Sequence, residues 1–134
     1  MQRRRTQPPK ILVVDDEPYI GDLLKAVIHR WRADAEVIYR SEGEAAWLES
    51  LRNEPDLLIT DINRPGMNGY QLLRLLARWN VRFPVLVISG GAKEENVRKC
   101  AGQNLEVSFL EKPFSIRRFV GELSRHLGPG DEFG

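Results

Sequence analysis

The stretch Asp56-Leu57-Leu58-Ile59-Thr60-Asp61 is a short apolar run that ends in a carboxylate. The apolar or β-favouring residues at 57–60 predict a strand buried on both faces, as in a parallel sheet. The residues that follow, 62–69, are rich in proline, glycine and asparagine, which is typical of a loop. We therefore expect Asp61 at the carboxyl end of a central strand, where open α/β sheets bind their ligands.

Three other apolar runs end in polar residues in the same way. They lie at 11–14, 84–88 and about 107–110. Because parallel strands of one sheet present their carboxyl ends at one edge, the residues that follow these runs should meet Asp61 there. The residues placed at this edge are Asp15, Asp16, Ser89 and Lys112.

The segments between the predicted strands have the apolar spacing of amphipathic helices. A further strand is expected at about 35–39. Helices are expected at 18–31, 42–52, 69–78, 93–101 and 116–127, the last with Ser115 as its cap. Five alternating strands and helices predict a parallel α/β sheet covered on both faces, with a flavodoxin-like strand order 2-1-3-4-5.

The helix expected at 42–52 carries the most detailed local prediction. Ser41 and Glu44 have the spacing of a capping box. The spacing of its apolar residues predicts that this helix buries Ala45, Leu48 and Leu51.

Length and composition limit the class of protein. A chain of 134 residues, 42% hydrophobic and 29% charged, fits one globular domain. The net charge of +1 gives no general electrostatic case for nucleic-acid binding. Cys100 is the sole cysteine, which favours a reducing, cytoplasmic location, and no apolar run is long enough to span a bilayer. We expect a flexible basic arm at 1–9, one domain at 10–127 and a flexible tail or linker stub at 128–134.

The expected cluster of carboxylates defines the chemistry. Three carboxylates in a small space repel one another unless a cation relieves them, and a bound Mg²⁺ or the ammonium of Lys112 could do so. An aspartate in such a setting can act as a nucleophile and form an acyl phosphate. Ser89 could then donate a hydrogen bond to the phosphoryl group.

At this point the chain resembles a known family. The runs at 11–18, 56–69, 84–90 and 109–114, in this order and at this spacing, are similar to the receiver domain of response regulators in bacterial two-component (phosphorelay) signalling. The resemblance covers about 10–127. It departs at Arg64, where the family usually has methionine, and at Phe109, where tyrosine is common.

The resemblance implies a role for each residue of the predicted site. Asp61 is the expected phosphoacceptor and Lys112 its partner, and the Lys112–Pro113 peptide is expected to be cis. Mg²⁺ is expected to bind Asp15, Asp16, Asp61 and the backbone carbonyl of Asn63. Ser89 and Phe109 are the expected switch residues, which repack the surface of the fourth helix, fifth strand and fifth helix.

The resemblance also implies partners. A histidine kinase or a histidine phosphotransfer protein would supply the phosphoryl group, and a homodimer through the fourth helix, fifth strand and fifth helix is a further expectation. The chain would be a signalling phosphoacceptor that catalyses only its own phosphorylation and dephosphorylation. The domain is not expected to bind nucleic acid or membrane, and the sequence does not identify its output domain or partner.

Three alternatives stay open at this point. Asp15 and Asp16 could simply cap the helix that follows them. The chain could be an interaction module that works without phosphorylation. It could also be a phosphohydrolase, although the general acid that such enzymes carry two residues after the nucleophile is here Asn63, which cannot transfer protons.

Overall fold

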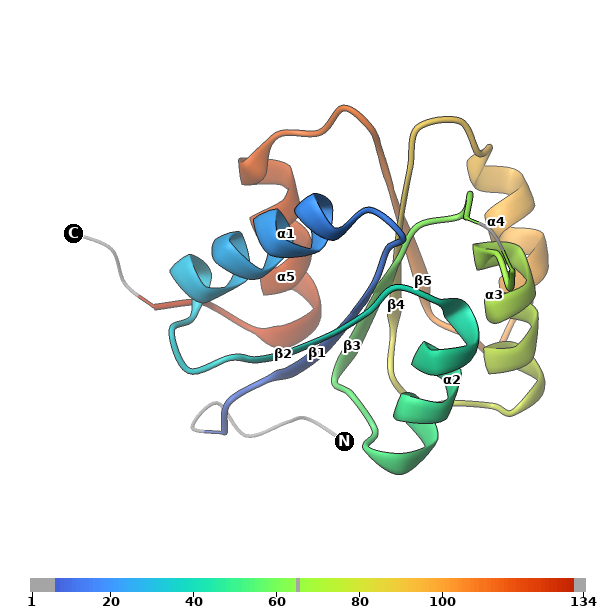
Figure 1. Cartoon of the computed structure of the whole chain (residues 1–134), viewed down its shortest axis with the longest axis horizontal. Coiled ribbons are helices and arrows are strands. Elements are labelled where there is room, and N and C mark those ends of the chain that lie inside the picture. The colour runs from blue at the N-terminus through green and yellow to red at the C-terminus, as the bar shows by residue number, and fades with distance from the viewer. Residues whose placement is uncertain (1–6, 65, 132–134) are drawn as a thin grey trace.

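The computed structural model describes residues 7–64 and 66–131. Strands and helices alternate along these residues (Figure 1). The strands are β1 (Lys10–Val14), β2 (Glu36–Arg40), β3 (Leu57–Thr60), β4 (Val85–Ser89) and β5 (Val107–Glu111). The helices are α1 (Pro18–Trp31), α2 (Gly43–Arg52), α3 (Gly69–Arg78), α4 (Glu94–Ala101) and α5 (Ile116–Leu127).

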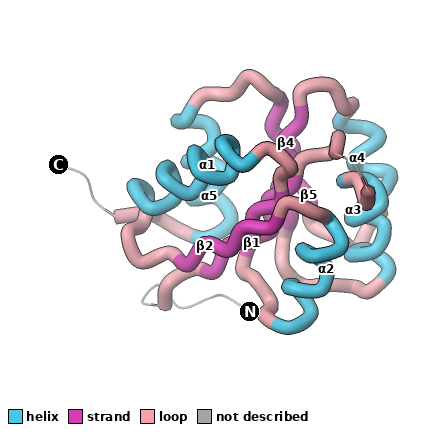
Figure 2. The backbone as a smooth tube through the Cα atoms, viewed as in Figure 1, coloured by secondary structure: helices cyan, strands magenta, loops and turns pink. Residues whose placement is uncertain are grey.

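All strand pairs are parallel, and the sheet order is β2-β1-β3-β4-β5, as predicted. Helices α1 and α5 cover one face, and α2, α3 and α4 cover the other (Figures 1 and 2). The central strands β1, β3 and β4 are buried along almost their whole length because helices pack on both of their faces. This arrangement places the carboxyl ends of β1, β3, β4 and β5 along one edge.

Two hydrophobic cores lie on either side of the sheet. Phe119 and Leu123 of α5 pack with α1 and the sheet on one side. Leu72 and Leu76 of α3 pack with α2, α4 and the sheet on the other. Side chains of the central strands alternate between the two cores. Packing on both faces therefore fixes the positions of the strand ends at the edge of the sheet.

The prediction for α2 was wrong in two respects. The helix begins at Gly43 after Glu42, without the Ser41–Glu44 capping box. Its buried residues are Gly43, Ala46 and Ser50, whereas Leu48 and Leu51 are each 52% exposed. The small Ala46 packs in the core with the sheet, and the indole of Trp47 packs against Trp79, the residue directly after α3, with ring centroids 5.5 Å apart. Packing against a neighbouring helix thus overrode the face favoured by apolar spacing.

The described residues that precede β1 and follow α5 form hydrogen bonds to the rest of the domain. The carbonyl of Pro9 accepts a hydrogen bond from the backbone N–H of Glu36 at 2.8 Å. Beyond α5, the N–H of Asp131 donates to the carbonyl of Trp31, and the Asp131 carboxylate accepts from the N–H of Ala33 at 3.0 Å. These residues were predicted as parts of a flexible arm and tail, whose outer residues, 1–6 and 132–134, lie outside the described ranges.

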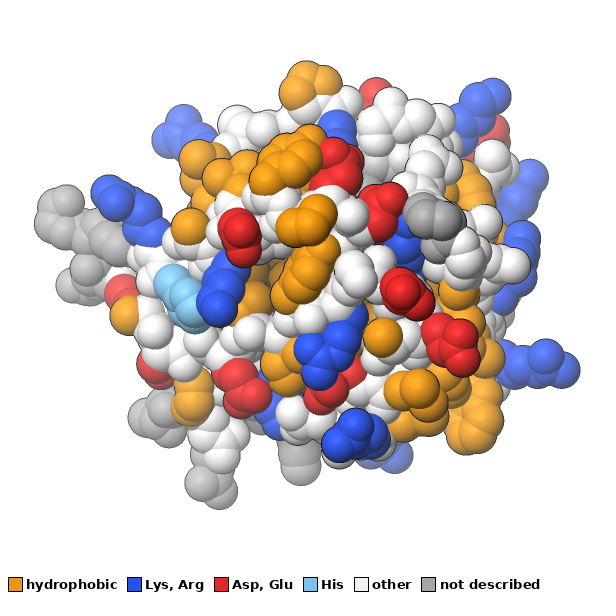
Figure 3. Space-filling view, viewed as in Figure 1, with side chains coloured by type: hydrophobic (Ala, Val, Ile, Leu, Met, Phe, Trp, Pro, Cys, Tyr) orange, Lys and Arg blue, Asp and Glu red, His pale blue; other side chains and the backbone are white. Residues whose placement is uncertain are grey.

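Charge is spread over the surface. Acidic and basic side chains are interspersed on the face shown in Figure 3, and hydrophobic side chains are visible over α1 and around α2. Tyr19 and Leu23 on α1 are 64% and 51% exposed. Within residues 7–64 and 66–131, no helix combines the length and the apolar character needed to cross a membrane.

Candidate phosphoryl-acceptor site

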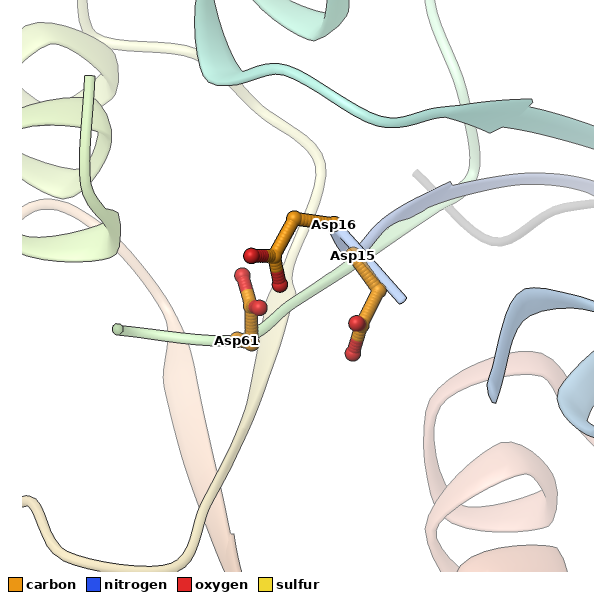
Figure 4. A group of neighbouring side chains, drawn as sticks. All are labelled: Asp15, Asp16 and Asp61. Atoms are coloured by element: carbon orange, nitrogen blue, oxygen red, sulfur yellow. The ribbon is translucent and has the colours of Figure 1, made fainter. Parts of the chain in front are cut away.

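Three carboxylates converge at the edge of the sheet. Asp15 and Asp16 follow β1, and Asp61 follows β3. Their carboxylate oxygens lie within 4.8 Å of one another, and Figure 4 shows Asp16 and Asp61 pointing toward each other beside Asp15. Asp15 and Asp61 are buried, and Asp16 is exposed. The convergence predicted from the two strand ends is confirmed.

Backbone hydrogen bonds hold the two strand ends in place. The N–H of Asp61 donates to the carbonyl of Val14 at 3.3 Å, which continues the β1–β3 pairing to the site. The Asp15 carboxylate accepts from the N–H of Glu17 at 2.9 Å. The hydroxyl of Tyr39, on β2, donates to the carbonyl of Asp15. Asp15 therefore holds the residue that precedes α1, but α1 itself begins without a side-chain cap, so the capping alternative does not account for Asp15.

The loop after Asp61 folds back so that the first residue of α3, Gly69, contacts the start of the loop. The N–H of Gly69 donates to the carbonyl of Ile62 at 2.9 Å. A Cβ at Gly69 would lie 2.3 Å from the backbone oxygen of Asp61, so only glycine fits here. Asn68 and Gln71 then form a capping box at the start of α3. These contacts bring the first turn of α3 directly against the Asp61 backbone.

Arg64 makes the ion pair with Asp61. Its guanidinium Nη1 donates to the Asp61 carboxylate, to the Asp61 backbone oxygen at 3.0 Å and to the Thr60 hydroxyl at 2.9 Å. The Arg64 side chain is 0% exposed. The sequence predicted positive charge near the loop, but it gave no sign that this side chain would turn inward onto the candidate nucleophile.

Burial dominates the electrostatics of Asp61. The pKa of its carboxyl is raised from 3.8 to about 6, mainly by burial, with smaller contributions from the neighbouring Asp15 and Asp16. The charge and hydrogen bond of Arg64 act in the opposite direction. Burial also raises the pKa of Asp15, while the hydrogen bond from Glu17 and the charge of Lys112 lower it. Two buried carboxyls in contact favour any cation that can neutralise both.

Ser89 and Lys112 reach the same edge from β4 and β5. The Ser89 hydroxyl oxygen accepts from the N–H groups of Gly91 and Ala92, at 3.3 and 3.0 Å, so its own O–H remains available as a donor. The backbone N–H of Lys112 donates to the Ser89 carbonyl at 2.8 Å, and the Lys112–Pro113 peptide is cis, as predicted.

Lys112 faces the carboxylates across a cavity. This cavity of about 420 Å³ lies between α1, α5 and the sheet, and Asp15, Asp61 and Lys112 line it together with mainly apolar residues. Among the ion pairs of the described residues, the partner of Asp61 is Arg64, and Lys112 takes part in none.

The other two predicted residues lie at the margin of the site. Asn63 is exposed in the loop after Asp61. Phe109 is half-buried on β5 and lines a hollow of about 650 Å³ with the loop that follows Ser89 and with Arg118 of α5. Nothing in the local sequence indicated the contact of Tyr39 with Asp15, because the two residues lie on different strands. The close approach of Gly69 to Asp61 depends on how the loop between them folds back.

These features define a family. The sequence profile described as "Response regulator receiver domain" matches residues 11–124. The chain therefore belongs to the response regulator receiver domain family, whose domains act in signalling.

Individual relatives are response regulators. The chain is 37% identical over 109 residues to the alkaline phosphatase synthesis transcriptional regulatory protein PhoP of Bacillus subtilis, covering 81% of this chain and 44% of that protein. It is 32% identical over 129 residues to the phosphate regulon transcriptional regulatory protein PhoB of Pseudomonas aeruginosa, covering 90% and 54%. The chain spans about half the length of these curated relatives.

Solved structures agree on the fold. The chemotaxis protein CheY4 of Vibrio cholerae superposes with a TM-score of 0.77 at 24% identity, over 90% of this chain and all of that one. The receiver domain of Francisella response regulator 1452 gives a TM-score of 0.76 at 25% identity, over 89% and 96%. The fold is that of a receiver.

Proposed function

We propose that this receiver domain is a phosphoacceptor switch in which Asp61 takes a phosphoryl group from a phosphohistidine of a kinase or phosphotransfer protein. The observation that carries the proposal is the placement of Asp61 at the end of β3, buried and within 4.8 Å of the carboxylates of Asp15 and Asp16. Membership of the response regulator family supports the same role.

The donor set of the site fits Mg²⁺. The three carboxylates are hard oxygen ligands of the kind that this ion takes in proteins. Asp15, Asp16, Asp61 and the backbone carbonyl of Asn63 are the residues that would hold it. When bound, Mg²⁺ would supply positive charge that the oxygens of a transferring phosphoryl group require.

The residues of the chain would carry out the rest of the reaction. A carboxylate oxygen of Asp61 attacks phosphorus, the new P–O bond forms as the P–N bond to the donor imidazole breaks, and the electron pair returns to the imidazole nitrogen. Lys112, which lines the same cavity, would pair with the phosphoryl oxygens, and the free O–H of Ser89 would donate to one of them. Each group lies at a strand end of the same sheet edge, so the fold brings all of them near the reacting atoms.

The output of phosphorylation would be a change in the surface formed by α4, β5 and α5. Movement of Ser89 toward the phosphoryl group would leave room for the half-buried ring of Phe109, which borders the hollow beside α4, to turn inward. That movement would repack α4, β5 and α5 and change their affinity for an output domain, a partner protein or a second copy of the chain.

An acyl-phosphate donor tests the proposal. Incubation with acetyl phosphate and Mg²⁺ should add one phosphoryl group in intact-mass measurement, and hydroxylamine should remove it. Asp61→Asn should abolish the addition. Asp56→Asn is the matched control, because Asp56 precedes the same strand at its opposite end and accepts from the N–H of Lys10 there. An unmodified wild-type chain would instead favour the interaction module that works without phosphorylation.

A further inference from the structure

Arg64 is a fully buried cation in direct contact with the proposed nucleophile. Its Nη1 is shared among the Asp61 carboxylate, the Asp61 carbonyl and the Thr60 hydroxyl. Buried arginines are rare unless they are paired, and Asp61 supplies the only ion pair of Arg64 within the described part of the chain. The guanidinium is therefore part of the site itself.

The other two nitrogen atoms of the Arg64 guanidinium lack hydrogen-bond partners among the described residues. Nε and Nη2 of Arg64 are buried, and neither has a hydrogen-bond partner among the described residues. An arginine has five N–H donors, so this side chain gives up much of its hydrogen bonding to stay where it is. Such an arrangement is unfavourable unless the opposing negative charge compensates for it.

The neighbouring helix leaves space for this side chain. Gly43 is the first residue of α2, and a Cβ there would lie 2.8 Å from Nη2 of Arg64 and 2.6 Å from the backbone oxygen of Met67. The start of α2 can therefore approach the loop only because Gly43 has no side chain. This packing helps to hold the Arg64 guanidinium against Asp61.

The guanidinium and a divalent cation need the same oxygens. The Asp61 carboxylate pairs with Arg64 and also lies within 4.8 Å of the carboxylates of Asp15 and Asp16. A hard divalent cation bound by those carboxylates would draw on the charge of Asp61 and repel Arg64. We propose that Arg64 is a built-in counter-ion that competes with the divalent cation for Asp61. The inference rests on the proposed function, because it takes Asp61 as a ligand of that cation.

This competition would regulate the site. While Asp61 pairs with Arg64, one carboxylate oxygen is engaged and the charge of the nucleophile is partly neutralised. Cation binding then requires the ion pair to weaken, so the cation affinity is set by Arg64 as well as by the carboxylates. Arg64 acts as a positioning residue, since it touches the proposed nucleophile and is not assigned a contact with the phosphoryl donor.

The test is a titration with Mg²⁺ alone on the 134-residue chain. Affinity is measured by calorimetry and by the shifts of the backbone amides near Asp16 and Asp61. Arg64→Met, which removes the charge but keeps a long apolar side chain, should bind Mg²⁺ about tenfold more tightly or better. Arg98→Met is the matched control, because it removes the same charge from an exposed ion pair with Glu94. It should leave the affinity within about twofold of wild type.

The outcomes separate this inference from the proposed function. Equal affinity of wild type and Arg64→Met would overturn the counter-ion role while leaving the metal site intact. No binding by either chain would overturn both. If Arg64→Met does not fold, the guanidinium nitrogen signals of Arg64 in the wild-type chain decide the question. They should shift as Mg²⁺ saturates the site, and unchanged signals would refute the competition.

Discussion

Neutralising Asp61 should remove a cost of folding that is present at neutral pH and absent at acid pH. The burial of this carboxyl raises its pKa from 3.8 to about 6, so its ionised form is less favourable in the folded chain than in the unfolded one. Asn is the neutral analogue of the protonated side chain and keeps a carbonyl oxygen that can accept from Arg64. Asp61→Asn therefore removes an unfavourable charge without leaving a cavity.

The magnitude follows from the shift. At about 1.4 kcal/mol per pKa unit, a rise from 3.8 to about 6 corresponds to roughly 3 kcal/mol of stability lost on ionisation. The folded chain binds more protons than the unfolded chain between these two pKa values, so this cost grows as pH rises from 3.8 to about 6. Above that range the full cost is present, and below it the cost disappears.

The assay is urea unfolding of wild type and Asp61→Asn in buffer with a metal chelator, since a bound cation would itself offset the charge. The stability of the variant relative to wild type should rise by roughly 2.5 kcal/mol between pH 4 and pH 7.5. A constant cost is superimposed on this change, because Arg64 loses its counter-charge in the variant at every pH. Asp22→Asn, an exposed carboxylate on α1, controls for the change in net charge and should alter stability by less than about 0.5 kcal/mol. A stability difference between wild type and Asp61→Asn that does not change with pH would refute the assignment of burial as the cause.

Three further predictions test the packing around the site. Phe119→Ala should cost about 3–5 kcal/mol in urea unfolding because the ring is 1% exposed in the core, whereas Ile116→Ala, at 60% exposure, should stay within about 0.5 kcal/mol. Gly69→Ala should destabilise the chain and slow phosphorylation by acetyl phosphate, because its Cβ would meet the Asp61 carbonyl. Gly121→Ala, with open space at its Cβ, is the control and should stabilise the chain by up to about 1 kcal/mol. Equal effects of the two substitutions would contradict the role of the close approach. Burial lowers the pKa of His126, so the contribution of His126 to the unfolding free energy should fall as pH drops below about 6.5, opposite to the contribution of Asp61. His126→Gln should remove this contribution, and an NMR titration showing an ordinary His126 pKa would argue against it.

The sequence by itself determined the fold and the convergence of the acidic residues. Short apolar runs at 11–14, 57–60 and 84–88, each followed by loop residues, favoured buried strands, and parallel pairing brings the carboxyl ends of such strands together. Asp15, Asp16 and Asp61 could thus be placed at one edge from local pattern alone. The match to the response regulator receiver family agrees with the predicted fold.

Only the tertiary structure decided which side chains touch. The buried face of α2 depended on Ala46 and on the contact between Trp47 and Trp79, neither of which is visible in the spacing of a single helix. The inward turn of Arg64 depended on the space that Gly43 leaves at the start of another element. Local patterns set backbone conformation over a few residues. The partner of a buried charge is instead chosen by the packing of segments distant in sequence, and here that packing brings Arg64 onto Asp61.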